Sequence, residues 1–116
     1  MTTATVDTTQ TQGTQETQSQ IIQEGLERQG MNVSQLAKLL GMKTGSFIYN
    51  IIHERTTMQK PETIERLAEI LEVDPDRMYI AANKLPPDIE ETVLEYPQLI
   101  QVVRNLRQRL EDKTIR

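Results

Sequence analysis

The side chains best suited to chemistry form one short polar face near the middle of the chain. Between residues 44 and 53, apolar residues recur at helical spacing, which leaves polar residues on the opposite side. These outward positions are Gly45, Ser46, Tyr49, Asn50 and His53. The serine, tyrosine, asparagine and histidine side chains among them can hydrogen-bond to the edges of nucleobases, and an asparagine can bond adenine at two atoms. The pattern predicts a surface that reads DNA bases; the alternative is an ordinary solvated helix face.

Groups that suit phosphate lie around this face. They are Asn32, Ser34, Lys43, Thr44, Arg55 and Lys60. Amides and hydroxyls near a helix N-terminus, and lysine or arginine side chains, bind phosphate oxygens without reading sequence. We expect the three cations to flank the helix where the phosphate strands run. For each of them the alternative is a solubilising surface charge.

The composition excludes several other kinds of site. The chain has no cysteine and a single histidine, His53, so neither a thiolate zinc site nor a paired-histidine relay can form. No catalytic arrangement or glycine-rich phosphate loop is visible. The apolar runs are far shorter than the roughly 20 residues that span a bilayer, and the N-terminus lacks a secretory pattern. We expect a cytoplasmic protein without enzyme activity, metal, cofactor or membrane contact.

Charge is distributed in blocks, although the net charge is −4. Residues 31–60 carry four bases against one acid, whereas residues 61–96 carry ten acids against three bases. Residues 97–116 are basic again, with five bases against two acids. Because salt screens charges beyond about 10 Å, a polyanion senses the nearest block rather than the total. The acidic total therefore does not exclude DNA binding by residues 31–60.

The elements that position these residues are predicted to be short helices. No segment alternates apolar and polar residues as a half-buried strand does, so we predict an all-α fold. Asn32 and Gln35 have the spacing of a capping box at the second helix, and Pro61 and Pro75 suit first helical positions. We expect Thr44 to cap the third helix. Its inward face is predicted to comprise Phe47, Ile48, Ile51 and Ile52.

Three segments follow from these patterns. Residues 1–19, mostly threonine and glutamine, predict a disordered tail. Residues 20–82 predict a five-helix domain, and residues 83–116 an extension of one or two helices. In that extension Leu99, Val103, Leu106 and Leu110 step by four, three and four residues, which is the spacing of a dimer seam. The alternative is that this stripe packs back on its own domain.

Two stretches carry a resemblance to a known family. Residues 31–42, MNVSQLAKLLGM, followed by residues 46–52, SFIYNII, resemble the helix-turn-helix of the phage-repressor-like (Cro/Xre) family. Residues 61–76, PETIERLAEILEVDPD, look like its fourth helix and the entry to its fifth. The resemblance covers about residues 20–80. It implies a five-helix DNA-binding domain and a sequence-specific transcriptional regulator.

The chain departs from the family pattern at three places. Val33 begins the second helix, where the family often has a glutamine that braces a phosphate. Lys43 is an extra residue in the turn, and residues 53–55 stand where a glycine usually follows the third helix.

The leading interpretation is a dimeric regulator, a repressor, that reads an inverted repeat in double-stranded DNA. The alternative is an adaptor or antitoxin-like interaction module, whose acidic residues 61–96 and C-terminal helix hold a protein partner.

Overall fold

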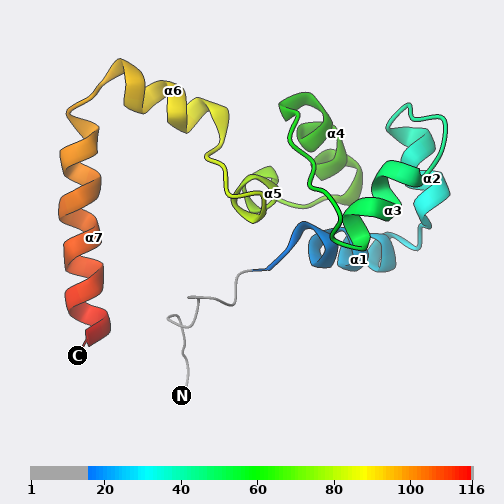
Figure 1. The fold of residues 1–116 in the computed structure, drawn as a ribbon, viewed down its shortest axis with the longest axis horizontal. Helices are drawn as coiled ribbons and strands as arrows, with labels where there is room; N and C mark the ends of the chain where they lie inside the picture. The colour runs from blue at the N-terminus through cyan, green and yellow to red at the C-terminus, as the bar shows by residue number, and fades with distance from the viewer. Residues whose placement is uncertain (1–15, 116) are drawn as a thin grey trace. The chain divides into compact units, whose positions relative to one another are not determined.

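The computed structural model describes residues 16–115, all of whose regular elements are α-helices. The elements are α1 (Gln18–Gln29), α2 (Val33–Leu39), α3 (Ser46–Ile52), α4 (Pro61–Leu71), α5 (Pro75–Ala81), α6 (Pro87–Glu95) and α7 (Leu99–Ile115). They are labelled in Figure 1. The predicted all-α class is confirmed. The described chain divides into residues 16–86, with α1 to α5, and residues 87–115, with α6 and α7.

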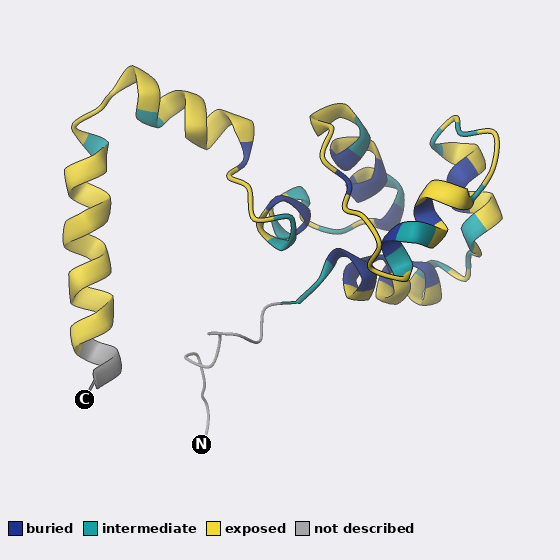
Figure 2. Ribbon diagram, in the orientation of Figure 1, coloured by how far each residue is buried: buried dark blue, intermediate teal, exposed yellow. Residues whose placement is uncertain are grey.

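Residues 16–86 enclose one aliphatic core, which is dark blue in Figure 2. Helix α1 packs against α3, α4 and α5, and α2 packs against α3 and α4. The largest fully buried side chains are Ile21, Ile22, Leu36, Ile48, Ile51, Met58, Ile64, Leu67, Leu71, Met78 and Tyr79. Helices α1 and α4 approach closely at Gly25, where a Cβ would lie 2.9 Å from Cδ1 of Leu71. Tertiary packing of this kind is what holds helices of seven residues, which are too short to be stable alone.

Side-chain caps and prolines set where four of these helices begin. The side-chain oxygen of Asn32 accepts from Gln35 N, and Gln35 Oε1 accepts from Asn32 N, both at 2.8 Å, so the predicted capping box is confirmed. Pro61 and Pro75 occupy first-turn positions of α4 and α5, as expected. A second capping box joins Thr17 and Gln20 at the start of α1.

All five helices of this unit end in the same way. A residue in the left-handed conformation follows each helix, and the next amide donates back to the carbonyl five residues earlier. This Schellman arrangement satisfies carbonyls that the helix leaves unpaired. The left-handed residues are Gly30, Gly41, Glu54, Glu72 and Asn83. Three of the five are therefore not glycine, so the helix ends are marked only partly in the sequence.

The predicted boundaries of the first domain are wrong at both ends. Residues 16–19, assigned to a disordered tail, belong to the folded unit: Thr17 caps α1, and Gln18 and Ser19 are buried. At the other end the unit extends to Pro86, which is buried, instead of stopping at residue 82. The rest of the predicted tail, residues 1–15, lies outside the described residues.

The second unit has no core of its own. None of the residues of α6 is buried, and none is buried in the described part of α7 up to Asp112. Val103, Leu106 and Leu110 are 57%, 49% and 64% exposed, and Leu99 is half-buried.

Candidate nucleic-acid interface

Helices α2 and α3 form the predicted pair of short helices joined by a glycine turn. Leu36 and Ala37 bury the inner face of α2, and Ile48 and Ile51 bury that of α3. Between them the chain turns at Gly41, whose φ of 79° is readily adopted by glycine. The inner faces hold the two helices against the core, so the opposite face of α3 is left towards solvent.

The outward face of α3 comprises Ser46, Tyr49, Asn50 and His53. Ser46, Tyr49 and His53 are exposed, and Asn50 is half-buried. The rings of Tyr49 and His53, four residues apart, meet edge to face with their centroids 4.4 Å apart. Neighbours four apart on a helix contact one another in this way, and an edge-to-face pair adds about 0.5–1.5 kcal/mol. The two rings therefore support each other within the predicted base-reading group.

Asn50 is held by Arg55, which was expected to contact phosphate. Arg55 Nη1 donates to Asn50 Oδ1 at 3.2 Å, and the Arg55 amide donates to the Asn50 carbonyl at 2.9 Å. Because a guanidinium only donates, the acceptor atom of the amide must be its oxygen. Asn50 Nδ2 then keeps two donors, and Oδ1 keeps a second lone pair, for any further partner.

Glu54 replaces the glycine that usually follows the third helix of the family. It adopts φ 59°, and it closes α3 through the bond from its amide to the Ile51 carbonyl at 2.9 Å. Glu54 thus adopts the left-handed conformation that a glycine would adopt at this helix end. For a residue with an L side chain this conformation costs roughly 1–2 kcal/mol. This ending brings Arg55 back beside Asn50.

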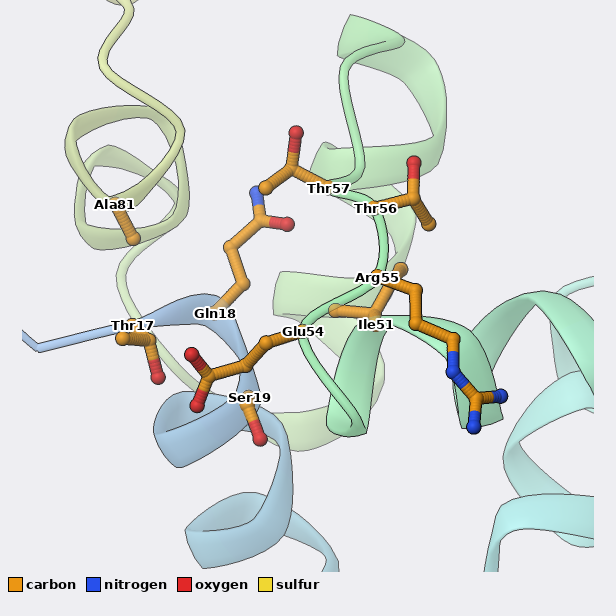
Figure 3. Close-up of a pocket in the computed structure, with 9 residues that line it drawn as sticks. All are labelled: Thr17, Gln18, Ser19, Ile51, Glu54, Arg55, Thr56, Thr57 and Ala81. Carbon is orange, nitrogen blue, oxygen red and sulfur yellow. The ribbon is translucent and has the colours of Figure 1, made fainter.

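The segment that follows α3, residues 54–60, is tied to the core by Gln18. Gln18 Nε2 donates to the carbonyls of Met58 and Met78 at 3.0 and 3.1 Å, and Gln18 Oε1 accepts from Met58 N at 2.6 Å. Figure 3 shows the Gln18 side chain extending from α1 towards this segment at Thr57. Gln18 is 2% exposed and Met58 1%, so these bonds are made away from water. They fix the path of the segment that carries Arg55 and Lys60.

Gln18 and its neighbour were missed by the sequence reasoning. Ser19 Oγ donates to the carbonyl of Ile52, the last residue of α3, at 2.6 Å. Thus α1 holds both the end of the outward helix and the loop beyond it. Thr17 and Gln20 have the spacing of a capping box, a signal in the sequence that could have assigned Thr17 and Gln18 to the folded unit.

A shallow pocket opens beside these contacts. It lies between the start of α1, the end of α3 and α5, as Figure 3 shows. The residues that line it are Thr17, Gln18, Ser19, Ile51, Glu54, Arg55, Thr56, Thr57 and Ala81. Its two buried polar side chains, Gln18 and Ser19, already hydrogen-bond within the protein, Gln18 to the backbone of Met58 and Met78 and Ser19 to Ile52 and Gln23. Neither is left aimed at a ligand.

The predicted cations lie at the surface. Lys43, Arg55 and Lys60 are exposed. Within the described residues, the ion pairs are those of Arg77 with Glu16 and Glu24. None of the three cations is therefore neutralised by a carboxylate there, and their charge remains available to an anion.

Three residues differ from the sequence expectation. Gly45 is half-buried, and a Cβ on it would meet Val33 Cγ1 at 2.9 Å, so it lies against α2 and does not share the outward face. Gly45, not Thr44, is the N-cap of α3; the Thr44 hydroxyl accepts weakly from Ser46 N at 3.3 Å. Phe47, expected to point inward, is 36% exposed, because the two buried isoleucines already fill the core side of this short helix.

Two of the remaining predicted contact residues flank the start of α2. Asn32 and Ser34 are exposed. The Asn32 side-chain oxygen is engaged as the cap of α2.

Residues 16–115 contain no cluster of three acidic or histidine residues that can hold a metal ion. None of the helices described is long and apolar enough to cross a membrane.

Comparison with known proteins identifies the domain. Residues 22–78 match a family model described as helix-turn-helix. No curated protein and no solved structure matched the chain. The matched segment runs from α1 into α5 and includes both α2 and α3. The same segment contains the exposed polar face of α3 and the three cations that have no carboxylate partner among the described residues. Residues 22–78 therefore belong to the phage-repressor-like helix-turn-helix family and form a DNA-binding helix-turn-helix domain.

Proposed function

We propose that the protein is a homodimeric transcriptional repressor that reads an inverted repeat through the major groove. The groove is about 12 Å wide and admits one α-helix, and α3 is the helix whose polar face is open. Ser46, Tyr49, Asn50 and His53 would face base edges. The exposure of Ser46, Tyr49 and His53, beside a half-buried Asn50, is the observation that carries the proposal.

The proposed phosphate contacts surround that helix. They are Asn32, Ser34, Lys43, Thr44, Arg55 and Lys60. Phosphate contacts fix the orientation of a protein on the duplex, while base contacts specify the sequence. The cations are supported by their exposure and by their lack of a carboxylate partner within the described residues. Thr44 and Asn32 have weaker support, because each side chain already has a hydrogen-bond partner in its own turn.

Dimer formation is proposed through the apolar stripe of α7, Leu99, Val103, Leu106 and Leu110. The seven-residue helix α3 can contact only a few base pairs, so a two-fold dimer would double the number of contacts with DNA. It would place two half-sites about 34 Å apart, one turn of the duplex. Repression follows most directly, since a dimer on its operator blocks other proteins from that stretch.

Selection of bound duplexes from a random pool by the purified full chain tests the proposal. Enrichment of a palindrome with half-sites about one turn apart is the expected result. Enrichment of a single unrepeated site would reject the dimeric reading. Absence of salt-sensitive duplex binding, together with a co-purifying protein, would favour the interaction module instead.

A further inference from the structure

The acidic helix α6 and the basic helix α7 have complementary faces that stay exposed among the residues the structure describes. Both are helices in the structure, yet their described residues are not buried. Isolated helices shorter than about 12–15 residues are marginal in water, so most helices depend on packing of an apolar face. The nine-residue α6 therefore needs a partner surface. We propose that a second copy of this chain supplies it, with α6 of each chain packed on α7 of the other.

The apolar stripes of the two helices are the first support. On α6, Ile89, Val93 and the following Tyr96 recur at helical spacing; Ile89 and Tyr96 are 45% and 49% exposed. Tyr96 continues the helical pattern, because its amide donates to the Thr92 carbonyl at 2.9 Å. On α7 the stripe is that of Leu99, Val103, Leu106 and Leu110. Pairing each α6 with the partner's α7 covers all four stripes in one two-fold arrangement.

The charges beside the stripes are the second support. Asp88 and Glu90 stand on either side of Ile89, and α6 contains no basic residue. On α7, Arg107 and Arg109 stand on either side of Leu106 and Leu110 at helical spacing. A stripe with acids on both sides thus faces a stripe with arginines on both sides. Complementary flanks of this kind set partner choice between helices.

The same charges disfavour a seam of two α7 helices alone. In such a seam the positions beside the stripe would be Ile100, Val102, Arg107 and Arg109. These include no acid to pair with an arginine, and α6 would remain uncovered.

Exposed apolar side chains are also present on both helices. Eight large apolar side chains between residues 89 and 110 are at least 42% exposed, and all of them except Leu94 lie on or beside the two stripes at helical spacing. They are Ile89, Leu94, Tyr96, Ile100, Val102, Val103, Leu106 and Leu110. This inference rests on the proposed homodimer and names its two contacting surfaces.

Charge reversal in the full chain tests the arrangement by sedimentation velocity at low salt. The α6 variant Asp88→Lys/Glu90→Lys places like charges against the partner's α7, and we expect its dimer Kd to rise about tenfold or more. The α7 variant Arg107→Glu/Arg109→Glu should show the same loss. The control Glu91→Lys/Asp112→Lys makes the same change in net charge as the α6 variant, but on the sides away from the stripes, so its dimer Kd should stay near that of the wild type.

Mixing the two weakened variants gives the decisive result. One chain then has basic residues beside both of its stripes and the other has acidic residues beside both, so both cross-chain pairs become attractive and a heterodimer should form. Recovery of a dimer in the mixture would also show that neither variant is misfolded. An α6 variant that dimerises like the wild type would overturn the inference, since a seam of α7 alone predicts that result. A wild-type chain that is monomeric, because its stripes pack within one chain or on another protein, would also overturn it.

Duplex binding by the same samples separates this inference from the proposed function. The α6 variant should still bind mixed-sequence duplex in a salt-dependent way through residues 16–86. If the wild type binds no duplex, the proposed function fails whatever sedimentation shows. If duplex binding persists but the reversals leave the dimer intact, only the α6–α7 pairing fails.

Discussion

Arg55 Nη1 lies 3.2 Å from Asn50 Oδ1 and donates a hydrogen bond to it. The residue proposed to bind phosphate thus orients the residue proposed to read a base. An exposed bond of this kind contributes little to folding, but it fixes which side of the amide donates. When Arg55 binds a phosphate, it either keeps its hydrogen bond to Asn50 or releases it. The effects on DNA binding of substituting the two residues should be coupled in the first case and independent in the second.

The first prediction is that Asn50 and Arg55 are coupled in DNA binding. Arg55→Ala should weaken binding to all duplexes and lower the salt slope by about 1. Asn50→Ala should relax preference at one base pair, at a loss of about 1–3 kcal/mol of discrimination. If Arg55 keeps orienting the amide, the double variant should lose less than the two single variants combined. Titrations of selected and random duplexes at several salt concentrations measure all three quantities.

Lys84→Ala is the control for this series, because it removes an exposed base outside the proposed contacts. It should change neither the base preference nor the coupling. Equal losses by Asn50→Ala on selected and random duplexes would contradict its role in reading a base.

A second prediction concerns Gln18. Gln18→Leu keeps the approximate size of the side chain but leaves the Met58 amide and two carbonyls without their partner. Each buried polar group left unpaired costs about 1–3 kcal/mol, so we expect a loss of several kcal/mol in the free energy of unfolding. Urea denaturation measures it. Glu27→Ala, on the exposed side of the same helix, should change stability by less than about 0.5 kcal/mol. A loss for Gln18→Leu as small as that of the control would show that water replaces these bonds.

The sequence predicted the helices of the first unit better than it predicted the contacts between them. Apolar spacing, the Asn32 capping box and the two prolines located α2, α4 and α5, because these signals act within a few residues. Gln18 was assigned to a tail, since its partners are 40 and 60 residues away and composition does not reveal such contacts. A polar residue also gives no sign in sequence that it will be buried.

The outward face of α3 was predicted in part. The exposed Ser46, Tyr49 and His53 follow from the two buried isoleucines by helical spacing alone. Gly45 was misplaced because its position depends on the distance between α2 and α3, which is set in three dimensions. The bond between Asn50 and Arg55 depends on the left-handed turn at Glu54, an unusual residue for that conformation.

That turn leads to a third prediction. Glu54→Gly should stabilise the domain by up to about 1–2 kcal/mol, because glycine adopts a φ of 59° without the strain of an L side chain. It should also strengthen duplex binding, since it removes an acid beside Arg55. Glu54→Gln is the matched control: it removes the charge and keeps the strained backbone. The stability gain should therefore appear only in the glycine variant, and the gain in binding in both. Equal stability of the two variants by urea denaturation would contradict the strain at this turn.

A fourth prediction concerns the contact between α2 and α3. Gly45→Ala places a Cβ about 2.9 Å from Val33 Cγ1, and valine has little freedom to move aside. We expect a loss of about 1–3 kcal/mol in stability from overpacking, and weaker duplex binding because α3 shifts. The double variant Val33→Ala/Gly45→Ala removes the contacting methyl groups and should recover much of both. Failure of the second substitution to rescue the first would show that the glycine is required for another reason.

The last prediction is a pH dependence of stability that arises from Glu16. Both guanidinium bonds to this carboxylate measure 2.8 Å, from Arg77 Nε and Nη2, and the hydrogen bonding with Arg77 lowers the pKa of Glu16 below its ordinary 4.5. The unfolded chain therefore binds a proton at a higher pH than the folded chain does. The stability that the pair contributes is complete above about pH 4.5 and is lost as the pH falls through the folded pKa.

Urea denaturation of the wild type and Glu16→Gln across this range measures the effect. The wild type should be the more stable at neutral pH, and the difference should shrink towards zero in acid. Because the Arg77 and Glu16 side chains are 38% and 39% exposed, the difference should be small and should fall with added salt. Glu27→Gln, which removes an exposed acid of α1, serves as the control and should show little difference at neutral pH. A Glu16→Gln difference that stayed constant from neutral to acid pH would mean that the carboxylate acts by packing rather than by its charge.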